Sequence, residues 1–175
     1  MKSCLILGGS ENVKEEAREA LTLFMPDTTI CINDIGSEYP TCDIWVSLHP
    51  EFFIEKKWVE NRIKNNLPLP KHIISHRKTD VVTEIIDYRW QGVHGSGSSG
   101  LYAVKVALTK GYDRIVLAGV PIDPLPHFFD DKAWLDYKQF RNAWLGNKER
   151  LLPSVRSMSG FTRELLGYPD KQFLL

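Results

Sequence analysis

The strongest constraint on the fold is an apolar strand that ends in glycine and serine and leads directly into a helix. Cys4-Leu5-Ile6-Leu7 is a continuous apolar run, typical of a strand buried on both faces of a parallel sheet. Gly8-Gly9-Ser10 follows it. Asn12 then predicts a helix start, apolar residues recur at helical spacing as far as Phe24, and Pro26 stops the helix. This strand–loop–helix unit is typical of α/β proteins.

The same alternation continues along the chain. Apolar runs predict further strands at residues 29–32, 43–48, 72–75 and 114–119. Helical spacing predicts helices over 50–65, after residue 100, in the second half of 128–144 and from about 159. Residues 77–94 fit either a strand or a short helix. The expectation is one α/β domain over residues 1–175, Rossmann-like, with a mostly parallel sheet and helices on both faces.

Composition narrows the range of partners. The 175 residues include 22 Lys plus Arg and 22 Asp plus Glu, so the formal net charge is zero. This balance disfavours nonspecific binding to nucleic acid or membrane surfaces. No window reaches the ~18 apolar residues of a membrane span, and the N-terminal apolar run is too short for a signal peptide. We therefore expect a cytoplasmic protein, which could form a homo-oligomer. Cys4, Cys31 and Cys42 are expected to be free thiols, and Cys4 and Cys31, which lie in apolar runs, are expected to be buried.

Ligands of doubly wound sheets bind outside the carboxyl ends of the strands. Small or polar residues follow four predicted strands here, and a further turn joins them: Gly8-Gly9-Ser10, Asn33-Asp34, Ser47-Leu48-His49, Ala118 to Asp123, and Gly95 to Gly100. Glycines allow close backbone approach, and helix N-termini attract anions. Neither glycine turn is a GxGxxG fingerprint or carries the lysine of a P-loop. The two glycine-serine turns together predict phosphate binding; the alternative is a pair of ordinary tight turns.

Individual polar residues at these ends are candidates for chemistry. Asn33 and Asp34 could bond a base, a ribose or a sugar hydroxyl, or they could form an Asx turn. Asp123 lies between two prolines and could anchor a hydroxyl or a metal, or act only in a turn. His94 and His127 flank two of the loops, and a histidine has the pKa required of a general base near neutral pH.

Other classes of site have little support. The sequence contains no HExxH motif or Cys/His cluster that suggests a structural zinc site, and no GxSxG nucleophile elbow. Trp134, Tyr137, Phe140 and Trp144 could line a lid over the pocket, with Arg141 available to an anionic group.

The segment from Ser98-Ser99-Gly100 through Gly111-Tyr112 to Gly119-Val120-Pro121-Ile122-Asp123 resembles the central motif of bacterial lipooligosaccharide sialyltransferases. That motif consists of a Ser-Gly turn, an alanine-rich helix, Gly-Tyr, a strand and Gly-Ile-Asp. The same segment of this chain is also similar to the 6-hydroxymethylpterin pyrophosphokinase-like proteins. The resemblance covers about half of the chain, in two blocks, and the short C-terminal region resembles small phage-encoded relatives.

The resemblance implies which residues bind the nucleotide. In these sialyltransferases the cytidine and phosphate of the donor contact the glycine loop, the asparagine and the Ser-Gly turn, without a metal. Carried over, this implies a nucleotide site made by Gly8, Gly9, Ser10, Asn33, Ser98, Ser99 and Gly100. The family's catalytic histidine precedes the last helix, where this chain has Val155-Arg156-Ser157, and Arg156 would there stabilise a leaving phosphate.

We therefore expect a nucleotide-dependent transferase that takes a CMP-type nucleotide sugar, with His127, His94 or Asp123 as the base and Arg156 at the phosphate. One alternative is an ATP-dependent pyrophosphokinase-like enzyme, which would use magnesium held by Asp34 and Asp123. Another is a nucleotide-binding module without turnover.

Overall fold

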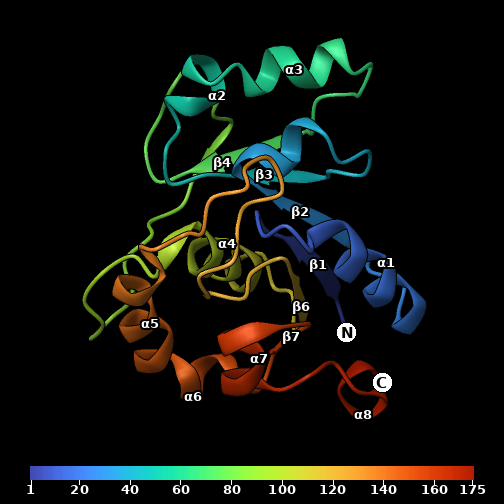
Figure 1. Cartoon of the computed structure of the whole chain (residues 1–175), viewed down its shortest axis with the longest axis vertical. Coiled ribbons are helices and arrows are strands. Elements are labelled where there is room, and N and C mark those ends of the chain that lie inside the picture. Colours follow the sequence, from blue (N-terminus) through green and yellow to red (C-terminus); the bar gives the residue numbers. More distant parts are fainter.

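A computed structural model describes all of residues 1–175 and contains one parallel sheet of seven strands (Figure 1). The strands are β1 (Ser3–Leu7), β2 (Thr28–Ile32), β3 (Ile44–Val46), β4 (His72–Ser75), β5 (Glu84–Ile85), β6 (Arg114–Ala118) and β7 (Val155–Ser157). Their order across the sheet is β5-β4-β3-β2-β1-β6-β7, and every neighbouring pair is parallel. The predicted α/β Rossmann-like class is confirmed.

The strand order reverses at β1. The chain builds outward from β1 through β2 to β5 and then returns to place β6 on the other side of β1. In such sheets the crevice at the carboxyl ends of the two strands at the reversal is the usual ligand site. Here Gly8 follows β1 and Gly119 follows β6 at that point.

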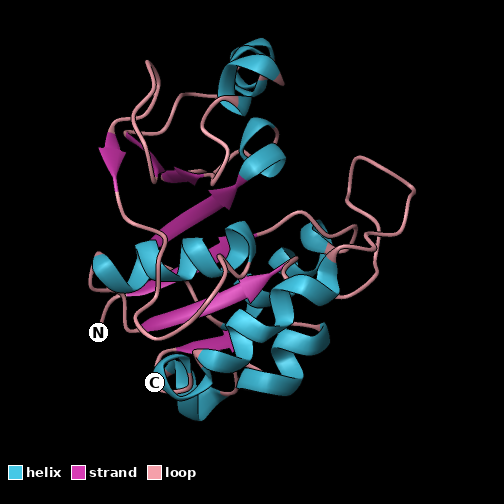
Figure 2. Cartoon of the chain, turned by 90° about the vertical axis from the view of Figure 1, so that its left-hand side faces the viewer, coloured by secondary structure: helices cyan, strands magenta, loops and turns pink.

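Helices cover both faces of the sheet, as Figure 2 shows after a 90° turn. One face packs against α4 (Ser98–Thr109), α5 (Tyr137–Gly146), α6 (Lys148–Leu151) and α7 (Gly160–Leu166). The other packs against α1 (Val13–Leu23), the 3₁₀ helix η1 (Asn33–Ser37), α2 (Phe52–Glu55), α3 (Trp58–Lys64) and α8 (Lys171–Leu174). This layering explains the continuous apolar strands, because alternate residues serve opposite layers: Ile6 belongs to the first core and Leu5 to the second.

Several predicted elements differ from the observed ones. The helix expected over residues 50–65 is two helices, because Lys57 adopts a left-handed φ of 56° that ends α2. Asn12 stands at the start of α1 but its side chain makes no capping hydrogen bond. The ambiguous segment 77–94 contributes only the two-residue strand β5. Strand β7 and helix α8 had not been expected; both are too short to show a period in the sequence.

Two other expectations concern the cysteines and the membrane. Cys4, Cys31 and Cys42 are all free and buried, so the prediction of buried thiols is confirmed. None of the helices has the length and apolar character needed to span a bilayer.

Candidate functional site

A cavity of about 510 Å³ opens at the carboxyl edge of the sheet, at the β1/β6 reversal. This volume lies within the usual range of small-molecule sites. The loops after β1, β2, β3 and β6 and the N-terminus of α4 all contribute to its walls. Of the residues predicted to bind a nucleotide, all eight line it: Gly8, Gly9, Ser10, Asn33, Asp34, Ser98, Ser99 and Gly100.

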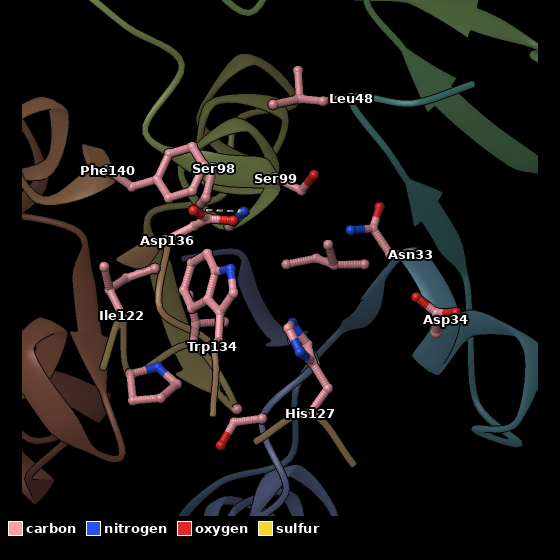
Figure 3. Close-up of a pocket in the computed structure, with 18 of the residues that line it drawn as sticks. Asn33, Asp34, Leu48, Ser98, Ser99, Ile122, His127, Trp134, Asp136 and Phe140 are labelled. Carbon is pink, nitrogen blue, oxygen red and sulfur yellow. Dashed lines mark hydrogen bonds between the residues drawn. The ribbon is translucent and has the colours of Figure 1, made fainter. Parts of the chain in front are cut away.

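Figure 3 shows how the side chains face one another across this cavity. The serines at the start of α4 lie on one side and His127 and Trp134 lie opposite them. The Asn33 amide projects into the space between them from the end of β2. Residues distant in the sequence thus converge on one volume.

Two buried polar atoms of the cavity have no hydrogen-bond partner. They are Ser10 Oγ and Asn33 Oδ1, and Ser10 is only 7% exposed. A buried polar atom left unpaired costs about 1–3 kcal/mol, so such atoms are usually satisfied by protein, water or ligand. Asn33 is also held at a left-handed φ of 53°, with its carbonyl accepting a 2.7 Å hydrogen bond from Trp45 Nε1. The unpartnered atoms Ser10 Oγ and Asn33 Oδ1 could therefore form hydrogen bonds with a polar ligand in the cavity.

The N-terminus of α4 forms the second polar part of the wall. Gly97 and Ser98 both have positive φ, which turns the chain sharply into the helix. Trp144 Nε1 donates to the Gly97 carbonyl at 2.7 Å and stabilises this turn. Space is tight, since a Cβ at Gly100 would lie 2.6 Å from Val120 Cγ1. The Gly100 N–H donates to Ser98 Oγ at 3.2 Å, and the remaining N–H groups of the first turn, with the positive dipole end, lie at the cavity.

His127 enters the cavity from the loop after β6. The backbone fixes this loop to the glycine turn, because Phe128 N donates to the Gly9 carbonyl and Glu11 N donates to the Pro126 carbonyl, each at 2.9 Å. Burial lowers the pKa of His127, so its imidazole is neutral at neutral pH. A neutral, partly buried imidazole is the form that accepts a proton.

Asp34 is held in place by an aromatic side chain. Trp58 Nε1 donates to Asp34 Oδ1 at 2.8 Å, which leaves the second carboxylate oxygen without a hydrogen bond to the protein. Trp58 itself is buried at the start of α3. The carboxylate therefore lines the cavity in a defined orientation.

Asp123 lines the cavity, but its carboxylate is engaged in structure. Oδ2 accepts a 3.1 Å hydrogen bond from the Phe161 N–H at the start of α7, and Oδ1 forms an ion pair with Arg141. Arg141 Nε also donates to the Ile122 carbonyl at 3.1 Å. The expectation that Arg141 is available to an anion is therefore wrong, and Asp123 has lost the free carboxylate that a base or metal ligand needs.

Two other predicted catalytic residues do not line the cavity. Arg156 lies on β7, and its guanidinium donates to the carbonyls of Leu152 and Val155 at 2.6 and 2.8 Å and packs over the Phe173 ring. It is not at the position expected for stabilising a leaving phosphate, because these carbonyls and the ring hold it on the α8 side of the sheet. His94 lies exposed in the loop before α4, outside the cavity wall.

The aromatic segment and the metal alternative also differ from expectation in part. Trp134 and Phe140 line the cavity and stack on each other with ring centroids 5.5 Å apart. Trp144 is fully buried beneath the site, and Tyr137 stays outside the lining. No group of three or more His, Cys, Asp or Glu side chains lies close enough to hold a metal ion.

One wall of the cavity, made by Phe52, Lys56 and Trp58, is not predicted by the sequence. These residues were assigned to the interior of a continuous helix. The backbone breaks at Lys57 without a glycine or proline to signal it, and residues on both sides of the break line the cavity.

Comparisons with known proteins bear on the fold. No protein-family model matches the sequence, and no curated protein matches it. Among solved structures, the chain is similar to the sialyltransferase CstII from Campylobacter jejuni, in a complex with the substrate analogue cytidine-5'-monophosphate. The TM-score is 0.56 and the identity 13%, over 100% of this chain and 88% of that one. The chain therefore has a sialyltransferase-like fold. Membership of that family stays a prediction, and so does the likeness to pyrophosphokinases.

Proposed function

We propose that the protein is a nucleotide-dependent glycosyltransferase that binds a CMP-type nucleotide sugar in the cavity at the β1/β6 reversal. The observation that carries this proposal is the pair of unpartnered buried atoms, Ser10 Oγ and Asn33 Oδ1, beside the N-terminus of α4. A phosphate would accept hydrogen bonds from the helix N-terminus and from Ser10. A nucleoside amine or hydroxyl would donate to Asn33. The sialyltransferase of similar fold was solved in complex with cytidine-5'-monophosphate, a nucleotide of the class proposed for this cavity.

The charge of the cavity favours a donor with a single phosphate. Lys56 is the one lysine or arginine among the lining residues, whereas Asp34 and Asp136 both contribute carboxylates. Enzymes that use ATP surround its phosphates with cations and Mg²⁺. Asp34 and Asp123, which the pyrophosphokinase alternative needs for magnesium, are already engaged with Trp58 and Arg141. The nucleoside monophosphate donor is therefore the better fit.

In the proposed reaction an acceptor hydroxyl attacks the anomeric carbon of the donor sugar. A new C–O bond forms, the bond from that carbon to the phosphate oxygen breaks, and CMP leaves with the bonding electrons. His127 takes the proton of the attacking hydroxyl. The N–H groups at the start of α4 stabilise the charge that develops on the leaving phosphate. Gly9 makes room for the base, because a Cβ there would lie 3.0 Å from His127 Cδ2.

A panel of ligands tests the proposal by thermal and chemical unfolding. It contains CMP, CMP-, UDP- and GDP-sugars, and ATP with and without Mg²⁺. A ligand at 100 times its Kd stabilises by about 2.7 kcal/mol, and we expect CMP and CMP-sugars to give this effect. Stabilisation by ATP with Mg²⁺ alone would favour the pyrophosphokinase alternative. Tight CMP binding without transfer or hydrolysis of any CMP-sugar would select the non-enzymatic module. If no nucleotide stabilises the protein, the proposal is wrong.

A further inference from the structure

The proposed donor site leaves one wall of the cavity without a role. This wall runs from the end of β3 through α2 to the start of α3, and its residues are His49, Phe52, Lys56 and Trp58. It differs in chemistry from the serine-glycine side, because it is aromatic and cationic. We call it the α2–α3 wall.

Lys56 is the only strong cation of the entire cavity lining. It follows the last residue of α2 and precedes Lys57, whose left-handed backbone ends the helix. Its Nζ lies 4.2 Å from the centroid of the Phe52 ring and 5.9 Å from that of Trp58. These cation–π contacts hold the ammonium at the wall and reduce the entropy lost when it binds an anion.

No carboxylate of the protein neutralises this ammonium. Lys56 takes part in none of the eight ion pairs of the structure. Arg141, which the sequence suggested for an anionic group, lies outside the lining and is paired with Asp123. Two carboxylates contact other residues of this wall: Asp34 accepts a hydrogen bond from Trp58, and Glu51, which is paired with Arg77, lies 3.6 Å from His49. An anionic ligand group entering the cavity therefore has one unpaired cationic partner, and it is Lys56.

The α2–α3 wall also lies close to the proposed base. His127 experiences the charges of both Asp34 and Lys56, which act on its pKa in opposite directions. Lys56 and His127 line the same cavity, so an anion held by Lys56 would share that cavity with the group that takes the acceptor's proton. The N-terminus of α4, which receives the donor phosphate in the proposed function, contributes to the lining from another element. The two anionic groups would therefore bind to different elements.

We infer that the acceptor substrate carries an anionic group, a carboxylate or a phosphate, which Lys56 binds beside the aromatic surface of His49 and Phe52. The inference rests on the proposed function, since it assigns the acceptor of that same reaction. His49 stacks on Phe52 with ring centroids 4.9 Å apart, which gives this wall an aromatic surface against which an acceptor sugar could pack.

The experiment compares matched acceptors on the protein saturated with CMP or a CMP-sugar. Each set contains a neutral hexoside, its uronate and its 6-phosphate, in the gluco, galacto and manno series. Binding by calorimetry and transfer by product analysis are measured for the wild type and for Lys56→Met, which keeps the apolar stem. We expect the wild type to prefer a charged member of at least one set, and Lys56→Met to reduce that preference by about tenfold. Comparing the binding and transfer of the uronate with those of the 6-phosphate shows which anion is preferred.

Two further variants make the result specific. Lys56→Arg keeps the charge and should keep most of the preference. Lys64→Gln removes a charge at the far end of α3, outside the cavity lining, and should leave the preference unchanged. The inference is overturned if the wild type binds neutral and charged acceptors equally. It is also overturned if Lys56→Met loses the same affinity for both. A lower CMP affinity in Lys56→Met also overturns it, because Lys56 would then serve the donor. Failure of the wild type to bind CMP contradicts the proposed function instead.

Discussion

Glu16 Oε2 accepts a 2.7 Å hydrogen bond from the backbone N–H of Gly119, directly joining α1 to the loop after β6. Both residues lie at the reversal of strand order, and Gly119 has a left-handed φ of 70°. Ser10 N in turn donates to the Gly119 carbonyl at 3.1 Å. A buried carboxylate thus supports the loop after β6, and that loop is hydrogen-bonded to Ser10, which carries one of the unpartnered polar atoms of the cavity.

Burial raises the pKa of Glu16 above the 4.5 of an exposed glutamate. The neutral carboxyl therefore stabilises the fold fully below pH 4.5, and this contribution is lost as the pH rises through the raised pKa. Glu16→Gln cannot ionise and keeps an acceptor for Gly119 N. We expect it to be more stable than the wild type at pH 8, by on the order of 1 kcal/mol. Urea unfolding from pH 4 to 8 measures this, and a parallel pH dependence of both proteins would contradict it.

Ser10→Ala should separate ligand binding from stability. The substitution removes an unpaired buried hydroxyl, so the unfolding free energy without ligand should stay equal or rise by up to about 1 kcal/mol. The affinity for CMP should fall about tenfold, because one hydrogen bond to the ligand is lost. Ser154→Ala, outside the cavity, is the matched control and should change neither. A marked loss of stability in Ser10→Ala without ligand would show that the hydroxyl serves the fold.

His127→Gln should reduce kcat/KM for transfer by about 10²–10⁴ and leave the CMP affinity within about twofold. In the wild type, the lowered pKa of His127 places the loss of the neutral base below pH 6.5. The rate should therefore be constant above that pH and fall only at lower pH. Rate–pH profiles of the wild type, His127→Gln and the exposed control His94→Gln check this. An unchanged profile in His127→Gln would exclude His127 as the base.

Asp123→Ala should act on stability rather than on proton transfer. It removes an ion pair with Arg141 and leaves Phe161 N without its acceptor, at a cost of about 1–3 kcal/mol. Asp123→Asn keeps an acceptor for Phe161 N and should lose less stability and little activity. A fall in kcat of more than about 100-fold in Asp123→Asn, with stability retained, would instead identify Asp123 as the base.

Gly8→Ala should be far more damaging than Gly111→Ala. A Cβ at Gly8 would lie 2.2 Å from the Gly119 carbonyl oxygen, so β1 and the loop after β6 could not approach. Gly111 has open space around it but a φ of 77°, so alanine there costs about 1–2 kcal/mol of backbone strain alone. We expect Gly8→Ala to lower the free energy of unfolding by more than about 3 kcal/mol or to prevent folding. Comparable unfolding midpoints for the two variants would contradict this account.

The sequence by itself determined the fold class and the loops of the site. Continuous apolar strands require a sheet covered on both faces, and parallel strands bring Ser10, Asn33 and Ser99 to one edge whatever the details of packing. These are local patterns joined by a general rule of topology, so a single chain is enough to find them.

Only the tertiary structure decided which charged groups are free. Asp123 and Arg141 are 18 residues apart, and the carbonyls that hold Arg156 turn it away from the cavity. The helix break at Lys57, next to Lys56, has no glycine or proline to signal it. Whether an ionisable group is paired or available depends on which distant partner lies within hydrogen-bond reach. Residue type and spacing carry no information about that reach, because it is set by the packing of the helices on the sheet.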